Sequence, residues 1–188
     1  MFCCWALSGC VVGSIEPFYT PDLVVQKPEL YGRWDFDDRF NPQANSQIIL
    51  SAGKLTIFDK EGNPLDAKIT FFMVEDSLFI DVFPDDGKLK ADLVGELPPV
   101  HLIGLLKPEA DKMTFIELDY DWLSQEVQSG RIKLRYTKDG EFTDVLFTPS
   151  SQEWVEFLKA YRHDPKAFSP DTENWLIRKP EFQQSMPQ

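Results

Sequence analysis

Apolar runs of strand length, separated by turn residues, repeat along most of this chain. The joints between them are mostly short, which favours antiparallel pairing of consecutive strands. A meander of this length can close on itself and remove its unpaired edges. The pattern predicts a mainly β domain, an antiparallel up-and-down barrel or a strongly curled sheet. The nine predicted strands are Tyr31–Phe36, Ser46–Leu50, Lys54–Phe58, Ala67–Val74, Ser77–Phe83, Val100–Leu106, Met113–Asp119, Ile132–Thr137 and Phe142–Thr148.

Two helices are expected among these strands. Asp121 is predicted to cap a short inserted helix from Trp122 to Gln128, which Gly130 would end. Ser150 and Glu153 form a capping box that predicts a C-terminal α-helix. Its apolar face should pack on the outside of the sheet or close one end of the barrel, and a partner-binding face is the alternative. That face consists of Trp154, Phe157, Leu158 and Tyr161.

The first ten residues have a different character. Phe2–Leu7 are uncharged and almost wholly apolar, and the string Leu7-Ser8-Gly9-Cys10 follows. This string resembles the cleavage box of a bacterial lipoprotein signal peptide. The resemblance implies cleavage before Cys10 and lipidation of its thiol, which would anchor the protein to a membrane of the bacterial cell envelope, periplasmic or surface-facing.

One feature of this signal is missing, because no Lys or Arg precedes Cys10. We therefore expect translation to begin upstream of Met1. The alternative is a cytosolic protein with an apolar N-terminal tail or first strand.

The domain organisation follows from these segments. Residues 1–9 are predicted to be the lipoprotein signal peptide, 10–28 the lipid anchor and an extended spacer, 29–163 the barrel with its packing helix, and 164–188 a Pro-rich tail. Docking of Phe18-Tyr19 on the barrel is the alternative to a free spacer. The body is long enough to bury one core without disulfides.

Composition narrows the function. All three cysteines lie among the first ten residues, so the body has no thiol chemistry. The net charge is -12, and acidic surfaces are repelled by nucleic-acid phosphates and anionic lipid head groups. We therefore expect no nucleic-acid partner, and membrane contact through the lipidated Cys10 alone.

Motifs of common enzymes are missing from the sequence. It contains no dinucleotide or phosphate-binding glycine loop, no nucleophile elbow, no His-Glu-x-x-His and no Cys-x-x-Cys. His101 and His163 are its only histidines, so no metal site, no cofactor and no catalytic residue is predicted.

Four acidic residues stand out in the strand region. Glu117, Asp119 and Asp121 alternate along a predicted strand and should form a solvated outer face. Asp81 either faces solvent or is buried with a partner, for which Arg33, Arg131 and Arg135 are candidates. The loop from Pro84 to Pro99 is either a lid over the barrel mouth or a helical turn packed on its rim.

The first body strand carries Gly32-Arg33-Trp34, which resembles the Gly-x-Trp signature of lipocalins. The resemblance implies a lipocalin-like barrel whose narrow end is closed by the Trp. The chain is also similar to a group of uncharacterised bacterial lipoproteins, which implies location and architecture and carries over no catalytic residue. The matching strings are 7–15, 17–19, 79–84, 99–101 and 121–123.

The predicted function is therefore binding of a small hydrophobic ligand by an envelope-tethered barrel. Trp34, Phe71 and Phe79 are the candidate lining residues, and His101 is the candidate for orienting a polar end of the ligand. A hydrogen bond from His101 to a backbone carbonyl is the alternative for that residue. The alternative function is a structural or interaction lipoprotein, in which a solid barrel contacts another envelope protein through its outer face or final helix.

Overall fold

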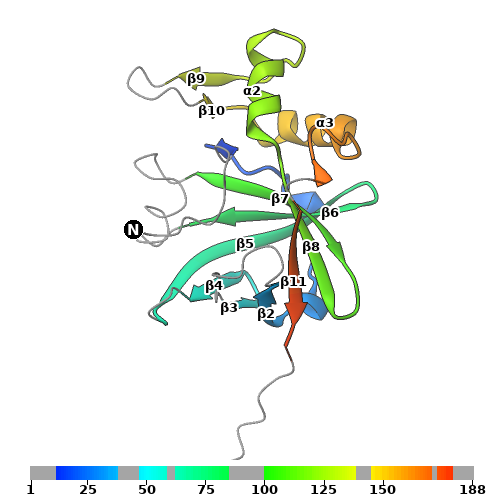
Figure 1. Cartoon of the computed structure of the whole chain (residues 1–188). Helices are drawn as coiled ribbons and strands as arrows, with labels where there is room; N and C mark the ends of the chain where they lie inside the picture. Colours follow the sequence, from blue (N-terminus) through cyan, green and yellow to red (C-terminus); the bar gives the residue numbers. More distant parts are fainter. Residues whose placement is uncertain are drawn as a thin grey trace, which may run out of the picture.

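The computed structural model describes residues 12–37, 47–58, 62–84, 100–138, 145–170 and 173–179, which form a barrel with a helical insertion (Figure 1). The helices are α2 (Tyr120–Gln128) and α3 (Ser151–Tyr161), with short 3-10 turns η1 (Pro21–Leu23) and η2 (Pro28–Leu30). The strands are β1 (Gly13–Ser14), β2 (Gly32–Phe36), β3 (Gln47–Ser51), β4 (Lys54–Phe58), β5 (Pro64–Val74), β6 (Ser77–Phe83), β7 (His101–Pro108), β8 (Lys112–Glu117), β9 (Tyr136–Lys138), β10 (Val145–Phe147) and β11 (Glu173–Arg178).

Within the described residues, eight strands form a closed antiparallel barrel. Strands β2 to β7 each pair with the next one along the chain, and β11 completes the ring between β8 and β2. Leu176 of β11, for example, lies opposite Met113 of β8 and Phe36 of β2. The prediction of a mainly β chain with an antiparallel barrel is confirmed.

Alternation along the strands builds two hydrophobic cores. Ile69 and Phe71 of β5 belong to the core inside the barrel, whereas Phe72 and Val74 belong to a second core on its outer side. Successive side chains of a strand leave opposite faces, so a strand covered on both sides is apolar at almost every position. Strand β6 has this character, since all but its last residue are buried.

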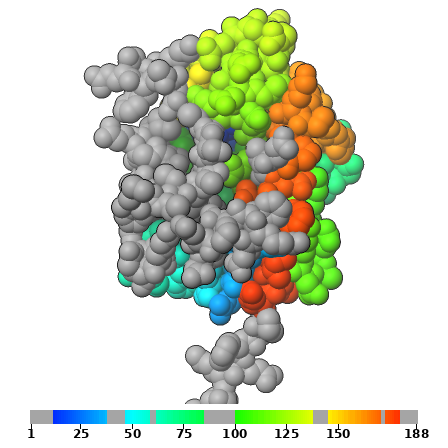
Figure 2. All heavy atoms as spheres, in the orientation of Figure 1, coloured from blue at the N-terminus to red at the C-terminus, as the bar shows by residue number. Residues whose placement is uncertain are grey.

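The outer core lies between the barrel and the insertion that carries α2 and α3 (Figure 1). Trp154 of α3 is fully buried there, with its ring centroid 5.8 Å from that of Phe147 and 4.5 Å from that of Phe18. Its indole Nε1 donates a hydrogen bond of 2.7 Å to Ser14 Oγ. In the space-filling view, α2 and α3 form one continuous mass at the top of the molecule (Figure 2).

The N-terminal segment is part of this core. Val12, Ser14 and Phe18 are at most 1% exposed, and β1 pairs with both β7 and β10. The extended spacer predicted over 10–28 is therefore wrong for residues 12–28, and docking on the barrel is correct. Single apolar residues that fill separate gaps show no periodicity, which is why this segment has the sequence pattern of a linker.

The predicted cap of α3 is confirmed, and the predicted cap of α2 is wrong. Ser150 and Glu153 form the predicted capping box at the start of α3. Helix α2 begins earlier than predicted, because Asp119 Oδ1, not Asp121, accepts the bond from Trp122 N at 2.7 Å. Gly130 follows α2 with φ +76°, the left-handed conformation that glycine adopts at helix ends.

The Pro-rich tail predicted over 164–188 is wrong for Glu173–Arg178, which form β11 and close the barrel. Helix α3 is consequently not the last element. The strand was missed because its apolar residues form only one short run, Trp175 to Ile177, with no alternation, and prolines flank it. Asn174 and Leu176 of β11 reach the barrel interior.

The first strand of the second hairpin begins later than predicted. Of the predicted strand Ile132–Thr137, Tyr136 and Thr137 lie in β9, and of the described part of Phe142–Thr148, Val145–Phe147 lie in β10; residues 142–144 lie outside the described residues. Ile132 and Leu134 are buried in the outer core without belonging to a strand. The predicted loop after Pro84, up to Pro99, lies outside the described residues.

Candidate ligand-binding cavity

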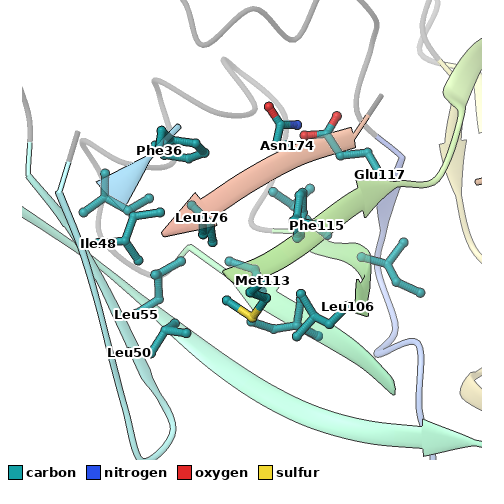
Figure 3. Close-up of a pocket in the computed structure, with 15 residues that line it drawn as sticks. Phe36, Ile48, Leu50, Leu55, Leu106, Met113, Phe115, Glu117, Asn174 and Leu176 are labelled. Carbon is teal, nitrogen blue, oxygen red and sulfur yellow. The ribbon is translucent and has the colours of Figure 1, made fainter. Parts of the chain in front are cut away.

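A cavity of about 110 Å³ lies inside the barrel (Figure 3). Most of the described side chains around it are aliphatic or aromatic, and they project from neighbouring strands at alternate positions. Small cavities with apolar walls are unfavourable for water and accept apolar molecules. The described lining residues are Phe36, Ile48, Leu50, Leu55, Ile57, Ile80, Val82, Leu102, Ile103, Leu106, Met113, Phe115, Glu117, Asn174 and Leu176.

One end of the barrel is closed by Trp34, whose side chain is fully buried. Its Nε1 donates a hydrogen bond of 3.0 Å to the carbonyl oxygen of Leu30 in η2. The guanidinium of Arg178 lies 4.3 Å from the centroid of the indole ring and donates to the carbonyl oxygens of Glu29 and Tyr31 at 2.5 and 3.1 Å. Arg178 therefore fastens η2 across this end.

The polar part of the cavity wall lies toward the other end. Strand β11 runs from Asn174 near that end to Arg178 at the closed end, and Asn174 lies opposite Phe115 of β8. Glu117 is two residues beyond Phe115 on the same face of β8. Figure 3 shows the Asn174 amide and the Glu117 carboxyl close together at the edge of the apolar cluster.

The pKa of the Glu117 carboxyl, which lines the cavity, is strongly raised. Burial raises its pKa from 4.5 to about 7, because the apolar surroundings disfavour the ionised form. A substantial share of this side chain is therefore protonated near neutral pH. Such a carboxyl can donate a hydrogen bond when it is neutral and accept one when it is ionised.

A glycine makes room for the aromatic part of the wall. The ring of Phe115 lies over Gly104 of β7, and a Cβ at position 104 would come within 2.0 Å of Phe115 Cε2. Any side chain at Gly104 would force this ring to move. The glycine thus fixes where the ring lies relative to the cavity.

Asp81 and His101 form a pair outside the barrel interior. Asp81 is 2% exposed; its Oδ1 lies 2.8 Å from His101 Nδ1, and its Oδ2 accepts a 3.2 Å hydrogen bond from Phe18 N. Asp81 is therefore the buried carboxylate of the two alternatives, with a histidine as its partner in place of the suggested arginines. The pair holds the N-terminal segment against β6 and β7.

The structure separates the residues predicted to contact a ligand. Trp34 and Phe71 belong to the interior core but are not among the described residues that line the cavity. Phe79 lies in the outer core and His101 pairs with Asp81, so neither of them is among the described residues that line the cavity. Cys10, the predicted lipidation site, lies outside the described residues.

The acidic run on β8 is not a solvated face. Glu117 lines the cavity, Asp119 caps α2, and Asp121 lies in the first turn of that helix. The strand ends at Glu117, so the alternation assumed for all three carboxylates stops there. A signal for Glu117 was present in the sequence, because it shares its alternation with Met113 and Phe115.

The described residues contain neither a metal-binding cluster nor a membrane-spanning helix. No group of three or more His, Cys, Asp or Glu side chains in this part of the chain is placed to hold a metal ion. No helix in the described ranges has both the length and the apolar character needed to cross a membrane.

Comparisons of the chain with known protein families, with curated proteins and with solved structures found no match.

Proposed function

We propose that this protein binds a small apolar molecule inside its barrel. The observation that carries the proposal is a cavity of about 110 Å³ with apolar walls and two polar side chains, Glu117 and Asn174, at one end. Binding sites of this kind combine an apolar surface with a few polar groups that orient the ligand. An engineered dry cavity of about 150 Å³ accepts benzene, so the expected ligand is a single ring or a short alkyl chain.

We further propose that the barrel is of the lipocalin type. Gly32 has φ +129°, and Trp34 fills the closed end, as the Gly-x-Trp resemblance implies. The order of elements differs from the expected one, since α2, the β9–β10 hairpin and α3 are inserted before the closing strand β11. These elements pack outside the barrel and leave its interior to the ligand.

The location we propose is the bacterial cell envelope, with Cys10 as the lipidated residue. The string Leu7-Ser8-Gly9-Cys10 supports this assignment. Because Val12, two residues after Cys10, is buried in the outer core, a lipid on Cys10 would hold the barrel close to the bilayer. Mass spectrometry of the full chain should find a diacylglyceryl group on Cys10, and Cys10→Ala should release the protein from membranes; an unmodified Cys10 in the mature protein would exclude the tether.

Exposed apolar side chains give less support to the alternative function, a protein that contacts a partner through its outer surface, than the cavity gives to ligand binding. Within the described ranges, the large apolar residues above a third exposed are Ile15, Val24 and Tyr136, at 42%, 38% and 39%. They come from different segments, and scattered exposed apolar residues are normal on soluble proteins. Binding is therefore the function we test first.

The test fills the cavity and leaves the rest of the protein unchanged. Val82→Phe adds a ring inside the cavity, and Val24→Phe makes the same substitution at an exposed position. Native mass spectrometry of the full chain purified from a bacterial host should find a small apolar molecule in the wild type and in Val24→Phe, and none in folded Val82→Phe. An empty wild-type barrel that also takes up no small apolar compound would overturn the proposal.

A further inference from the structure

We propose that the ligand is a single-ring aromatic compound, whose ring stacks on the side chain of Phe115 inside the barrel. This inference rests on the ligand-binding function proposed above, and it adds the chemical class of the ligand and the residue that selects it. The observation behind it is the way in which the ring of Phe115 lies against Gly104 in the cavity wall.

The ring of Phe115 lies flat on the backbone of β7. Gly104 is on the inner face of that strand, because Leu102 and Leu106, two residues to either side of it, line the cavity. A Cβ at Gly104 would lie 2.0 Å from Phe115 Cε2, 2.6 Å from Cζ and 2.7 Å from Cδ2. Because the distances to these three adjoining ring atoms are similar, the Cβ would meet the face of the ring and not its edge. The opposite face of the ring is therefore turned toward the cavity.

A flat ring at a fixed place in the wall favours an aromatic ligand. Two aromatic rings in offset-stacked contact gain free energy beyond that of the area they bury. Met113, two residues before Phe115 on the same face of β8, is 2% exposed and lines the same cavity (Figure 3). A thioether sulfur makes favourable contacts with the edge of an aromatic ring. The wall thus offers a ring face and a sulfur atom to an aromatic ligand.

The size of the cavity favours a single ring. Its volume is about 110 Å³, and an engineered dry cavity of about 150 Å³ accepts benzene. The ring of Phe115 cannot move back to enlarge the cavity, because the backbone of β7 at Gly104 lies directly behind it. A rigid ring also loses less conformational freedom on binding than a flexible chain of the same carbon number. One ring therefore fits better than an alkyl chain or a fused ring system.

The experiment compares benzyl alcohol with cyclohexylmethanol, which has the same carbon skeleton and hydroxyl group but a saturated ring. Isothermal titration calorimetry on the full chain near neutral pH measures both dissociation constants. Benzyl alcohol should bind about threefold more tightly, although cyclohexylmethanol is the more hydrophobic compound. Equal or tighter binding of cyclohexylmethanol would overturn the aromatic assignment and leave the cavity as a ligand site. Failure of both alcohols to bind would overturn the ligand-binding function itself.

Two matched variants identify the residue that selects the ligand. Phe115→Leu removes the aromatic face and keeps an apolar side chain, whereas Tyr136→Leu removes an aromatic ring from an exposed position of β9. Phe115→Leu should abolish the preference for benzyl alcohol, and Tyr136→Leu should leave both dissociation constants within about twofold of wild type. A preference that persists in folded Phe115→Leu, or that is also lost in Tyr136→Leu, would contradict the role of Phe115.

A further variant tests the position of the ring. Gly104→Ala places a Cβ where the ring lies and should push the ring into the cavity, so both alcohols should bind at least about fivefold more weakly. Adding Phe115→Leu to Gly104→Ala should restore the binding of cyclohexylmethanol to within about twofold of that in Phe115→Leu alone. Unchanged binding of benzyl alcohol in Gly104→Ala would show that this ring does not bound the ligand site, and would overturn the proposal.

Discussion

Replacing Glu117 with glutamine should stabilise the ligand-free protein at alkaline pH and have little effect at acid pH. Burial raises the pKa of the Glu117 carboxyl from 4.5 to about 7 in the folded protein. Between these pH values, the folded state binds more protons than the unfolded state, so stability falls as pH rises through the window. Glutamine cannot ionise and does not suffer this loss.

The size of the effect follows from the same two values. A rise from 4.5 to about 7, at about 1.4 kcal/mol for each pKa unit, corresponds to about 3 kcal/mol. Because the Glu117 side chain is partly exposed, this figure is an upper bound. The stabilisation of Glu117→Gln relative to wild type should be near zero at about pH 4 and approach about 2 to 3 kcal/mol at about pH 8.

Urea unfolding followed by tryptophan fluorescence at several pH values measures this difference directly. Glu173→Gln is the control, since Glu173 faces outward and pairs with Lys107 at 3.7 Å. Its effect should stay below about 1 kcal/mol at every pH, as is usual for a surface ion pair. If the unfolding free energies of Glu117→Gln and wild type differ by a constant amount across the pH range, Glu117 is not the buried carboxyl described here.

Three further substitutions test the packing around the site, each by urea unfolding. Gly104→Ala should lower the free energy of unfolding by about 1 to 3 kcal/mol, because its Cβ would clash with the Phe115 ring. Adding Phe115→Leu to this variant should restore most of the loss, whereas additive losses from the two substitutions would contradict the clash. Asp81→Ala should lower the free energy of unfolding by about 3 kcal/mol and expose the N-terminal segment to protease. The control Asp76→Ala, at an exposed turn, should lower it by less than about 1 kcal/mol. Equal losses would show that the pair of Asp81 and His101 does not stabilise the fold. Arg178→Met should lower the free energy of unfolding by about 2 kcal/mol and speed amide hydrogen exchange in η2. An unchanged exchange rate would show that the guanidinium does not hold this turn in place.

The barrel could be predicted from the sequence because its strands follow one another along the chain. Lys54–Phe58 and Ser77–Phe83 were predicted with their observed bounds, since each is an apolar run between turn residues. Strand β11 could not be found in this way. It closes the barrel from a Pro-rich segment far along the chain, and only its pairing with β2 and β8 identifies it as a strand.

The binding site was harder to predict because the sequence does not show which face of a strand points inward. In β6, Phe79 and Ile80 are both buried, one outside the barrel and one inside, since helices cover the outer face. Where both faces are apolar, alternation no longer distinguishes them. Phe79 was therefore assigned to the interior together with Phe71, although the two residues lie in different cores.

The same ambiguity hid the polar end of the cavity, and its resolution explains why Glu117 matters. A carboxylate near the end of a strand normally indicates a solvated face, which is what the sequence predicts for Glu117. The alternation that places Met113 and Phe115 inside the barrel also places Glu117 there, and the insertion that follows Glu117 returns the chain at β11 with Asn174 beside it. A carboxyl held in an apolar wall destabilises the fold when it ionises. The stability that Glu117→Gln should gain at alkaline pH is therefore a direct consequence of where the alternation of β8 places this carboxyl.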